Sequence, residues 1–514
     1  MKQIIATILL AGVMLTFSSC EKYLDINKNP NNPDQVEAAL LLAPIQNFYA
    51  LGIQFDARYI GRYVQNWQWF GAGDAWDLHG YVPNSDAGGE IWRNVYWKGG
   101  LNLENLIADA RANEKWDYLG VGLAMKAWGW QMLTDAHGEI ILSEAYDSDP
   151  NKNTFNYDTQ EKVYAEIVRL CNEAIQALNR TDGRVSQVQL ARGDVIYKGD
   201  RLKWKRFAYG LLAVTTQRLA SKKSAYDPNK VISYVDSSFT SNADDAMLTF
   251  NGLNTTDASF FGPIRGNLQP YGQSAFIVRL MDGTVFEGAK DPRMPLMLQP
   301  SGDGTYRGLT PGSGQSTAAS VPTNTRVVNP WGGTLNVTPA ANTPGKYIFT
   351  NTGPFPLMTH AQLQFIKAEA AFLKGDKATA LAAYRRGIES HLTSPLFGTG
   401  ISAADRTAYL TNETIIPKTA AELTLNQIML QKYIAEWGWG FLDTWSDLRR
   451  YNYSSDVYTS FQLPQNYFQN NNGKPVQRLR PRYNSEYVWN IDALNKIGGL
   501  DIDFHTKPLW FTQP

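Results

Sequence analysis

Residues 361–388 read as two helices joined by a tight turn, and this stretch constrains the fold more than any other part of the chain. Apolar or small side chains recur at helical spacing in both halves: Leu363, Ile366, Ala370 and Leu373 before the turn, and Ala378, Leu381 and Ala382 after it. Gly375 and Asp376 interrupt the pattern between the two halves. Because alanines let two helices approach closely, the stretch predicts a helix pair of the tetratricopeptide type.

Other helical patterns of similar length occur along the chain. Residues 120–134 show one such pattern, and a capping box formed by Asp158 and Glu161 is expected to open another. Asp200 is expected to cap a further helix, and the pattern around Trp92 and Trp97 places both of these side chains in the core. No clean repeat of ~34 residues recurs. The sequence therefore predicts a mostly α fold with helix pairs as its scaffold.

The composition changes between residues 251 and 354. Gly, Pro, Thr, Ser and Asn dominate there, and no helical period survives. A loop this long in a compact protein is either functional or disordered. Short β segments are expected at 326–328, 334–337 and 347–349. The predicted organisation is a first helical part at 41–250, a loop-rich insertion at 251–354, and a second helical part at 355–514 that contains the tetratricopeptide-like pair.

The first 20 residues are typical of a bacterial lipoprotein. An apolar run from Ile4 to Phe17 follows Lys2, and two serines stand directly before Cys20. The run is short for a transmembrane helix, which needs roughly 20 residues, whereas small residues before a cysteine permit cleavage and lipid attachment. We predict a signal peptide at 1–19, a lipid such as palmitate on Cys20, and an extended Asn/Pro-rich leader at 20–40.

Charge and motif content argue against several classes of protein. Lys and Arg total 48, as do Asp and Glu, so the chain lacks the basic excess expected of a nucleic-acid-binding protein. The five histidines are scattered, and neither a His-Glu-x-x-His nor a Gly-x-Ser-x-Gly motif is present. The Asp/Asn-rich segments 25–29 and 147–153 lack the Gly and Glu of a calcium loop and are expected to form turns. We expect no enzyme activity, no cofactor and no metal site.

Acidic and basic residues in the helical motifs are interpreted as buried pairs that tie helices together. They are Glu369, Asp447, Arg449, Arg450 and Glu486. Asp443 and Asp447 lie one helical turn apart and would imitate the paired carboxylates of a glycosidase. The arginines at 449–450 favour salt bridges instead.

The sharpest candidate for a ligand site is the aromatic segment at 67–76. Glycines interrupt it, so we expect a loop, and exposed tryptophans on a loop favour a binding role. Sugar rings stack on aromatic faces while neighbouring polar groups bond the hydroxyls. The candidates are Trp67, Trp69, Trp76 and Tyr81 as platform, Asp74, Asn66 and Arg62 as polar contacts, and Trp331 in the insertion as a second aromatic contact. The alternative is that some of these tryptophans fill the core.

Five motifs are spread over nearly the whole chain: DINKNPN at 25–31, LTDAHGEI at 133–140, FIKAEA at 365–370, QKYIA to DLRR at 431–450, and RPRYNSE at 480–486. In this order they resemble the SusD-like (SusD/RagB) lipoproteins of Bacteroidetes. Departures at Ile140 and at 208–211 are interpreted as packing changes. The resemblance implies a right-handed superstructure of tetratricopeptide-like helix pairs, with the ligand site on loops. It also implies a SusC-like TonB-dependent outer-membrane transporter as partner.

The residues and the resemblance together predict a binding protein anchored in the outer membrane and facing the cell exterior. Such a protein would capture oligosaccharide and deliver it to the transporter, acting as its lid. The same scaffold capturing peptides is the alternative, and a surface glycosidase is a third, weaker one. The aromatic segment favours the glycan.

Overall fold

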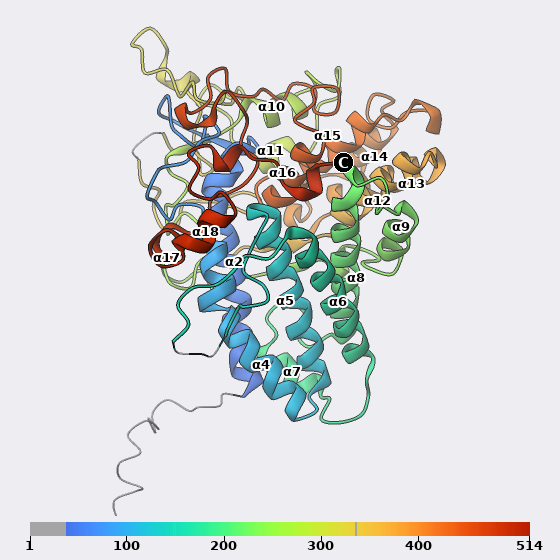
Figure 1. The fold of residues 1–514 in the computed structure, drawn as a ribbon. Coiled ribbons are helices and arrows are strands. Elements are labelled where there is room, and N and C mark those ends of the chain that lie inside the picture. Colours follow the sequence, from blue (N-terminus) through green and yellow to red (C-terminus); the bar gives the residue numbers. More distant parts are fainter. Residues whose placement is uncertain (1–36, 148, 150, 335–336) are drawn as a thin grey trace, which may run out of the picture.

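The computed structural model describes residues 37–147, 149, 151–334 and 337–514 (Figure 1). The predicted signal peptide, Cys20 and most of the leader lie outside these residues. The helices of the first half are α2 (Ala38–Tyr63), α3 (Glu90–Arg93), α4 (Gly100–Ala112), α5 (Trp116–His137), α6 (Gln160–Asn179), α7 (Gln187–Gly193), α8 (Arg201–Arg218) and α9 (Pro228–Asp236). Those of the second half are α10 (Ala275–Met281), α11 (Met294–Met297), α12 (His360–Lys374), α13 (Lys377–Leu392), α14 (Ala403–Thr411), α15 (Leu425–Glu436), α16 (Phe441–Arg450), α17 (Tyr483–Trp489) and α18 (Ile491–Lys496).

The long helices of the first half run side by side in the lower part of Figure 1. α5 packs against α4 and α6, and α8 packs against α6 and α9. α9 in turn contacts α12, which packs along α13. Because these helices pack side by side in pairs, the chain forms stacked helix pairs, which confirms the predicted mostly α architecture.

Among the described residues, α2 is long and apolar enough to cross a membrane by length and composition alone. Half of its apolar window is buried inside the protein. Ile45, Tyr49 and Ile53 belong to the core, and α2 packs against α4 and α7. Core packing therefore accounts for the apolar character of this helix.

The predicted helix pair is α12 and α13. The Thr359 side chain accepts the backbone N–H of Gln362, whose side-chain oxygen accepts the backbone N–H of Thr359, so the two form a capping box. Gly375 ends α12 with φ 87°, a left-handed conformation that glycine adopts without strain. Asp376 then caps α13 by accepting the backbone N–H of Thr379 at 3.1 Å. Local sequence signals thus determine both ends of this turn.

The start of α6 differs from the prediction. Its N-cap is Thr159, whose side chain accepts a backbone N–H of the first turn. The Asp158 carboxylate accepts the backbone N–H groups of residues 142–143 instead, and so holds that loop against the helix. The predicted capping box of Asp158 and Glu161 is therefore wrong, whereas Asp200 caps α8 as expected.

The described strands are short and join distant parts of the chain. β1 (Trp67–Trp69) pairs antiparallel with β3 (Tyr271–Gln273), and β2 (Ala246–Leu248) pairs antiparallel with β4 (Phe355–Met358). Because β2 and β4 flank the insertion, their pairing brings its two ends together. β3 joins the insertion to the segment that follows α2.

The insertion itself contains regular structure that its composition did not indicate. α10 and α11 both lie within it. The predicted β segments at 326–328 and 347–349 are wrong, because both are irregular in the structure. The segment at 334–337 lies partly outside the described residues.

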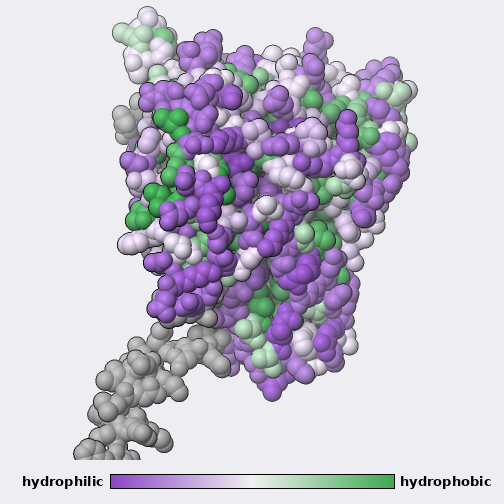
Figure 2. Space-filling view, viewed as in Figure 1, coloured by the Kyte–Doolittle hydropathy of each residue, from purple (hydrophilic) through white to green (hydrophobic). Residues whose placement is uncertain are grey.

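The surface is mostly hydrophilic, with its main apolar area on the left of Figure 2, the side on which α17 and α18 lie in Figure 1. The exposed apolar side chains on these helices are Val488, Trp489 and Ile491. The opposite face of α17 lines the two cavities described below.

Candidate ligand-binding site

Three of the predicted ligand-binding tryptophans are buried. Trp67 on β1 is 1% exposed, and Trp76 and Trp331 are buried as well. Trp331 donates its indole N–H to the Phe349 carbonyl at 3.1 Å. Gly61 makes room for Trp67, since a Cβ at Gly61 would lie 2.9 Å from the indole ring. The prediction of an exposed aromatic platform is therefore wrong for Trp67 and Trp76, because the loop after α2 folds onto the core. The separate prediction that Trp331 exposes an aromatic face in the insertion is wrong as well, because its ring is buried.

Two of the three predicted polar contacts, Arg62 and Asp74, belong to an internal network. Arg62 is buried and donates from Nε to Asp77 Oδ1 at 2.7 Å, and it also pairs with Asp74. Asp77 accepts the backbone N–H of Trp69 at 3.0 Å. Burial raises the pKa of Asp77, and the Arg62 guanidinium opposes that rise. Arg62 and Asn66 are buried and offer no surface to a ligand, contrary to the prediction, whereas a ligand role for Asp74 stays a prediction.

Trp69 and Tyr81 keep part of their surface exposed. Trp69 packs edge-on against Tyr271, with ring centroids 5.4 Å apart, and its ligand role stays a prediction. Tyr81 lines a cavity of 110 Å³. We call this the basic cavity, and its main lining residues are Trp76, Tyr81, Arg478, Arg480, Arg482 and His505. Two residues of the predicted platform, Trp76 and Tyr81, are thus brought together, although at a cavity and not on an open loop.

A larger cavity of 570 Å³ opens beside it. We call it the aromatic cavity, and its apolar walls are Trp92, Tyr96, Trp97, Leu101, Tyr146 and Phe155. They come from α3, the π-helical turn Asn94–Lys98, the start of α4 and the loop before α6. The cavity is large enough for a small ligand, and its lining is predominantly apolar, as is usual for ligand sites.

Trp97 is the most exposed aromatic side chain of the aromatic cavity. It is 63% exposed, whereas Trp92 is 2% exposed, so the prediction that both lie in the core is right for Trp92 and wrong for Trp97. Tyr96, four residues after Trp92, packs against it with ring centroids 4.9 Å apart. Trp97 follows one position later and extends into solvent. The Arg93 guanidinium lies 4.7 Å from the centre of the Trp97 ring, a cation–π contact that orients it.

Charged residues lie around the aromatic cavity. Glu486, which lines the cavity, is buried and accepts a hydrogen bond from the Tyr157 hydroxyl at 2.6 Å. This bond holds its carboxylate in place. Hydrogen bonds from Asn156 lower the pKa of Glu144 at the rim. Arg482 pairs with Asp86 and lines both cavities. An exposed ring beside charged groups suits a ligand with apolar faces and hydroxyl edges.

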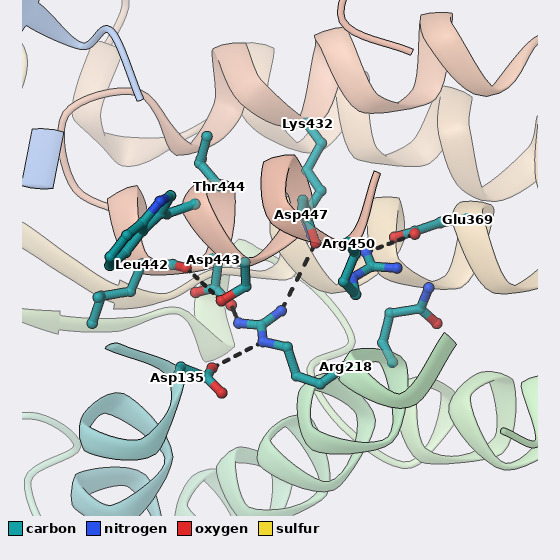
Figure 3. A network of polar contacts seen from close by, with 12 residues as sticks. Asp135, Arg218, Glu369, Lys432, Leu442, Asp443, Thr444, Asp447 and Arg450 are labelled. Atoms are coloured by element: carbon teal, nitrogen blue, oxygen red, sulfur yellow. Dashed lines mark hydrogen bonds and ion pairs between the residues drawn. The ribbon is translucent and has the colours of Figure 1, made fainter. Parts of the chain in front are cut away.

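The acids of the helical motifs take part in a separate, buried ion network (Figure 3). Arg218 lies between Asp135, Asp443 and Asp447, with its Nε 2.9 Å from Asp135. Arg450 joins Asp447 to Glu369 on α12, each at 2.7 Å or less. The prediction of buried acid–base pairs is confirmed for Glu369, Asp447 and Arg450. It is wrong for Arg449 and Glu486, which are buried but bond to neutral groups among the described residues. Asp443 and Asp447, the pair that imitated a glycosidase, are both bound to arginines.

The remaining candidate residues, the acids of the Asp/Asn-rich segment at 147–153 and Cys171, have structural roles. Within the described ranges no group of three or more His, Cys, Asp or Glu side chains is placed to hold a metal ion. Asp147 and Asp149 accept backbone N–H groups two residues further on, as expected for turns. Cys171 is a buried free thiol on α6.

Comparisons with known proteins agree on one family. A sequence profile named SusD-like, described as "Starch-binding associating with outer membrane", matches residues 30–481. Similar solved structures include a chitin-binding protein (TM-score 0.69, 21% identity, covering 93% of this chain and 100% of that one). They also include a chitin-binding SusD homologue from Flavobacterium johnsoniae (0.68, 20%, 92% and 98%) and a SusD/RagB family protein from Bacteroides thetaiotaomicron (0.65, 21%, 93% and 99%). None of the curated proteins compared with the chain matches it.

Proposed function

Since the chain belongs to the SusD-like family, whose members are non-catalytic binding proteins, we propose that it captures oligosaccharide at the cell surface and delivers it to a TonB-dependent outer-membrane transporter. The observation that carries the proposal is the aromatic cavity, where Trp97 exposes its ring beside Arg93. C–H faces of a sugar ring would stack on the indole, while Arg93 and Glu144 would bond the hydroxyls. Affinity should lie in the micromolar to millimolar range, about −4 to −8 kcal/mol, because cargo must be released.

Trp97→Ala is expected to weaken oligosaccharide binding about tenfold, a loss of about 1.4 kcal/mol. The physical reason is the loss of the exposed stacking face. Trp489→Ala is the matched control, because Trp489 is 70% exposed but lines neither cavity. Calorimetric titration with malto- and chito-oligosaccharides, the glycans named for the family and its relatives, measures both. Equal losses in the two variants would contradict the assignment of the site.

Peptide capture on the same scaffold is the competing function. A peptide ligand would engage backbone-pairing groups, whereas the aromatic cavity offers ring faces. The same titration with a panel of short peptides separates the two. Binding of peptides together with no binding of any glycan would overturn the proposal.

The lipid anchor gives a second prediction. Cys20→Ala should abolish incorporation of labelled palmitate and release the protein from the membrane fraction, because a thiol at the cleavage point is what receives the lipid. Several acyl chains, at ~0.8 kcal/mol per buried CH₂, hold a protein stably. Ser18→Ala, which keeps a small residue before the cysteine, is the control. Normal labelling of the Cys20→Ala protein would show that the anchor lies elsewhere.

The partner follows from the same proposal. A lid over a transporter stays bound to it, so affinity purification of the tagged lipoprotein from membranes should recover a TonB-dependent barrel in near-equal amount. Confinement beside the pore would raise the effective concentration of captured glycan. Recovery of the lipoprotein alone under mild detergent would argue against the lid.

A further inference from the structure

The basic cavity contains a guanidinium group without a carboxylate partner. Three arginines at alternate positions, 478, 480 and 482, line it. Arg478 pairs with Glu139, and Arg482 pairs with Asp86. In the described part of the chain Arg480 forms no ion pair, and its Nη atoms donate to the Tyr487 hydroxyl and to backbone carbonyls of residues 499–502. The cavity lining therefore has one positive charge in excess.

Two N–H donors of the basic cavity are unused. Trp76 and Arg480 both line the cavity, and neither Trp76 Nε1 nor Arg480 Nε has a hydrogen-bond partner among the described residues. Both atoms are buried from solvent. A buried donor without an acceptor costs about 1–3 kcal/mol, so an acceptor group in the cavity would recover that cost. An anionic acceptor would also balance the charge of Arg480.

His505 offers a hydrogen-bond acceptor to the basic cavity, in contrast to the donors of Trp76 and Arg480. Its Nε2 lies 2.9 Å from Asn471 Oδ1, and the Asn471 amide nitrogen donates to two backbone carbonyls, so Oδ1 is the acceptor and Nε2 carries the proton. Nδ1 is then a lone-pair acceptor, and it has no partner among the described residues. Burial and the Arg480 guanidinium lower the pKa of His505 to about 3, which keeps the ring neutral. The cavity thus offers a site for a hydroxyl donor close to the site for an acid.

The size of the basic cavity limits the ligand. Its 110 Å³ corresponds to about four waters, at roughly 30 Å³ for each in the liquid. That is room for a carboxylate and the adjacent edge of a sugar ring, with the rest of the ring outside the cavity. Tyr81 supplies a ring face, over which the Arg480 guanidinium lies at 4.5 Å from the centroid. Arg482 is shared with the aromatic cavity, so one extended ligand would reach both.

We propose that the basic cavity binds one acidic sugar residue, a hexuronate, of a glycan whose adjacent residues stack on Trp97. The carboxylate would accept from Arg480 Nε and Trp76 Nε1, and a ring hydroxyl would donate to His505 Nδ1. A hexuronate carries both groups on one ring. This inference rests on the proposed glycan function and narrows its ligand to acidic polysaccharides.

The test compares uronate oligosaccharides with their own neutral forms. Oligogalacturonate and oligomannuronate are titrated calorimetrically beside the same oligomers after carboxyl reduction, at low and at high salt. At least one acidic oligomer should bind about tenfold tighter than its reduced form, and salt should diminish the difference. A short peptide with a free C-terminal carboxylate forms a further arm, because it offers the acid without the ring hydroxyls.

Two substitutions of Arg480 distinguish the effect of its charge on the ligand from its structural role. Arg480→Gln should reduce the preference for the acidic oligomer to below about threefold, and Arg480→Lys should retain most of it. Because both substitutions remove bonds to the 499–502 loop, equal loss in the two variants would assign Arg480 a structural role and overturn the inference. Circular dichroism melting confirms that each variant is folded. Trp97→Ala should weaken the acidic and neutral oligomers alike.

The remaining outcomes distinguish the inference from the function on which it rests. Equal affinity for acidic and neutral oligomers overturns the hexuronate site while leaving glycan capture intact. Tighter binding of the peptide than of either uronate overturns it in favour of a peptide carboxylate. No binding of any glycan overturns both.

Discussion

Asp447→Asn is expected to lower the free energy of unfolding by about 3–5 kcal/mol, the usual cost of breaking a buried ion pair. Asp447 is buried and accepts Lys432 Nζ and Arg450 Nη2, each at 2.6 Å (Figure 3). Burial alone would raise its pKa, but the cations around it, Lys432 and Arg450 first, hold it at about 2. The substitution would therefore leave two buried cations facing a neutral amide.

Glu436→Gln is the matched control, since Glu436 lies in the same network. Burial raises its pKa well above the ordinary value of 4.5 and outweighs the opposing effect of Lys432, so we expect it to be protonated in the folded protein. The charges agree with this assignment. Three cations, Arg218, Lys432 and Arg450, already pair with the four carboxylates of Asp135, Glu369, Asp443 and Asp447, so a charged Glu436 would add one more uncompensated negative charge. Because the Gln amide has the same shape and is also neutral, Glu436→Gln should leave the free energy of unfolding almost unchanged.

The two variants also differ in the pH dependence of their stability. A raised folded-state pKa means that the stabilisation by Glu436 is full below the unfolded pKa and is lost as pH rises toward the folded one. Glu436→Gln removes this loss, so the variant should gain stability relative to wild type as pH rises from 5 to 8. Urea unfolding followed by circular dichroism at both pH values measures this. Destabilisation of Glu436→Gln as large as that of Asp447→Asn would contradict the protonation assignment.

The sequence predicted correctly those helix ends that are determined by capping residues next to them in the chain. Gly375, Asp376 and Asp200 all act within one turn of their own helices, and all do so as expected. Asp158 does not cap α6 as predicted, because the loop at 142–143 supplies backbone N–H groups that compete for its carboxylate. This loop lies outside the local capping pattern, so the pattern gave no sign of it. Caps are predictable from sequence when no tertiary partner competes.

The ligand site was harder to predict, because burial of a tryptophan is a tertiary property. Trp67 occupies space left by Gly61 on α2, and an interrupted aromatic segment looks the same whether it faces solvent or core. Trp97 was missed for the opposite reason, since a helical pattern around it indicated packing. The pair Gly99-Gly100, at the junction of the π-helical turn and α4, is the signal that could have marked an interruption of the helical pattern there.

The insertion should detach from the second helical part when Arg293 is replaced. Arg293 and Asp291 are fully buried, with Nε 2.8 Å from Asp291 Oδ1. The same guanidinium contacts His391 Nδ1 on α13 and Gln431 Oε1 on α15, each at 2.8 Å. Burial and the adjacent guanidinium lower the pKa of His391, so its Nδ1 accepts. One side chain therefore ties the insertion to two helices of the second helical part.

Arg293→Met is expected to cost about 3–5 kcal/mol, because it leaves Asp291 buried without its cation. The double variant Asp291→Leu/Arg293→Met should recover most of this loss, since apolar groups of similar volume often replace a buried pair at little cost. Urea unfolding gives the free energies, and amide hydrogen exchange in 275–300 shows whether the insertion opens locally in the single variant. A double variant less stable than the single one would mean that the contacts to His391 and Gln431, and not the pair with Asp291, hold the insertion in place.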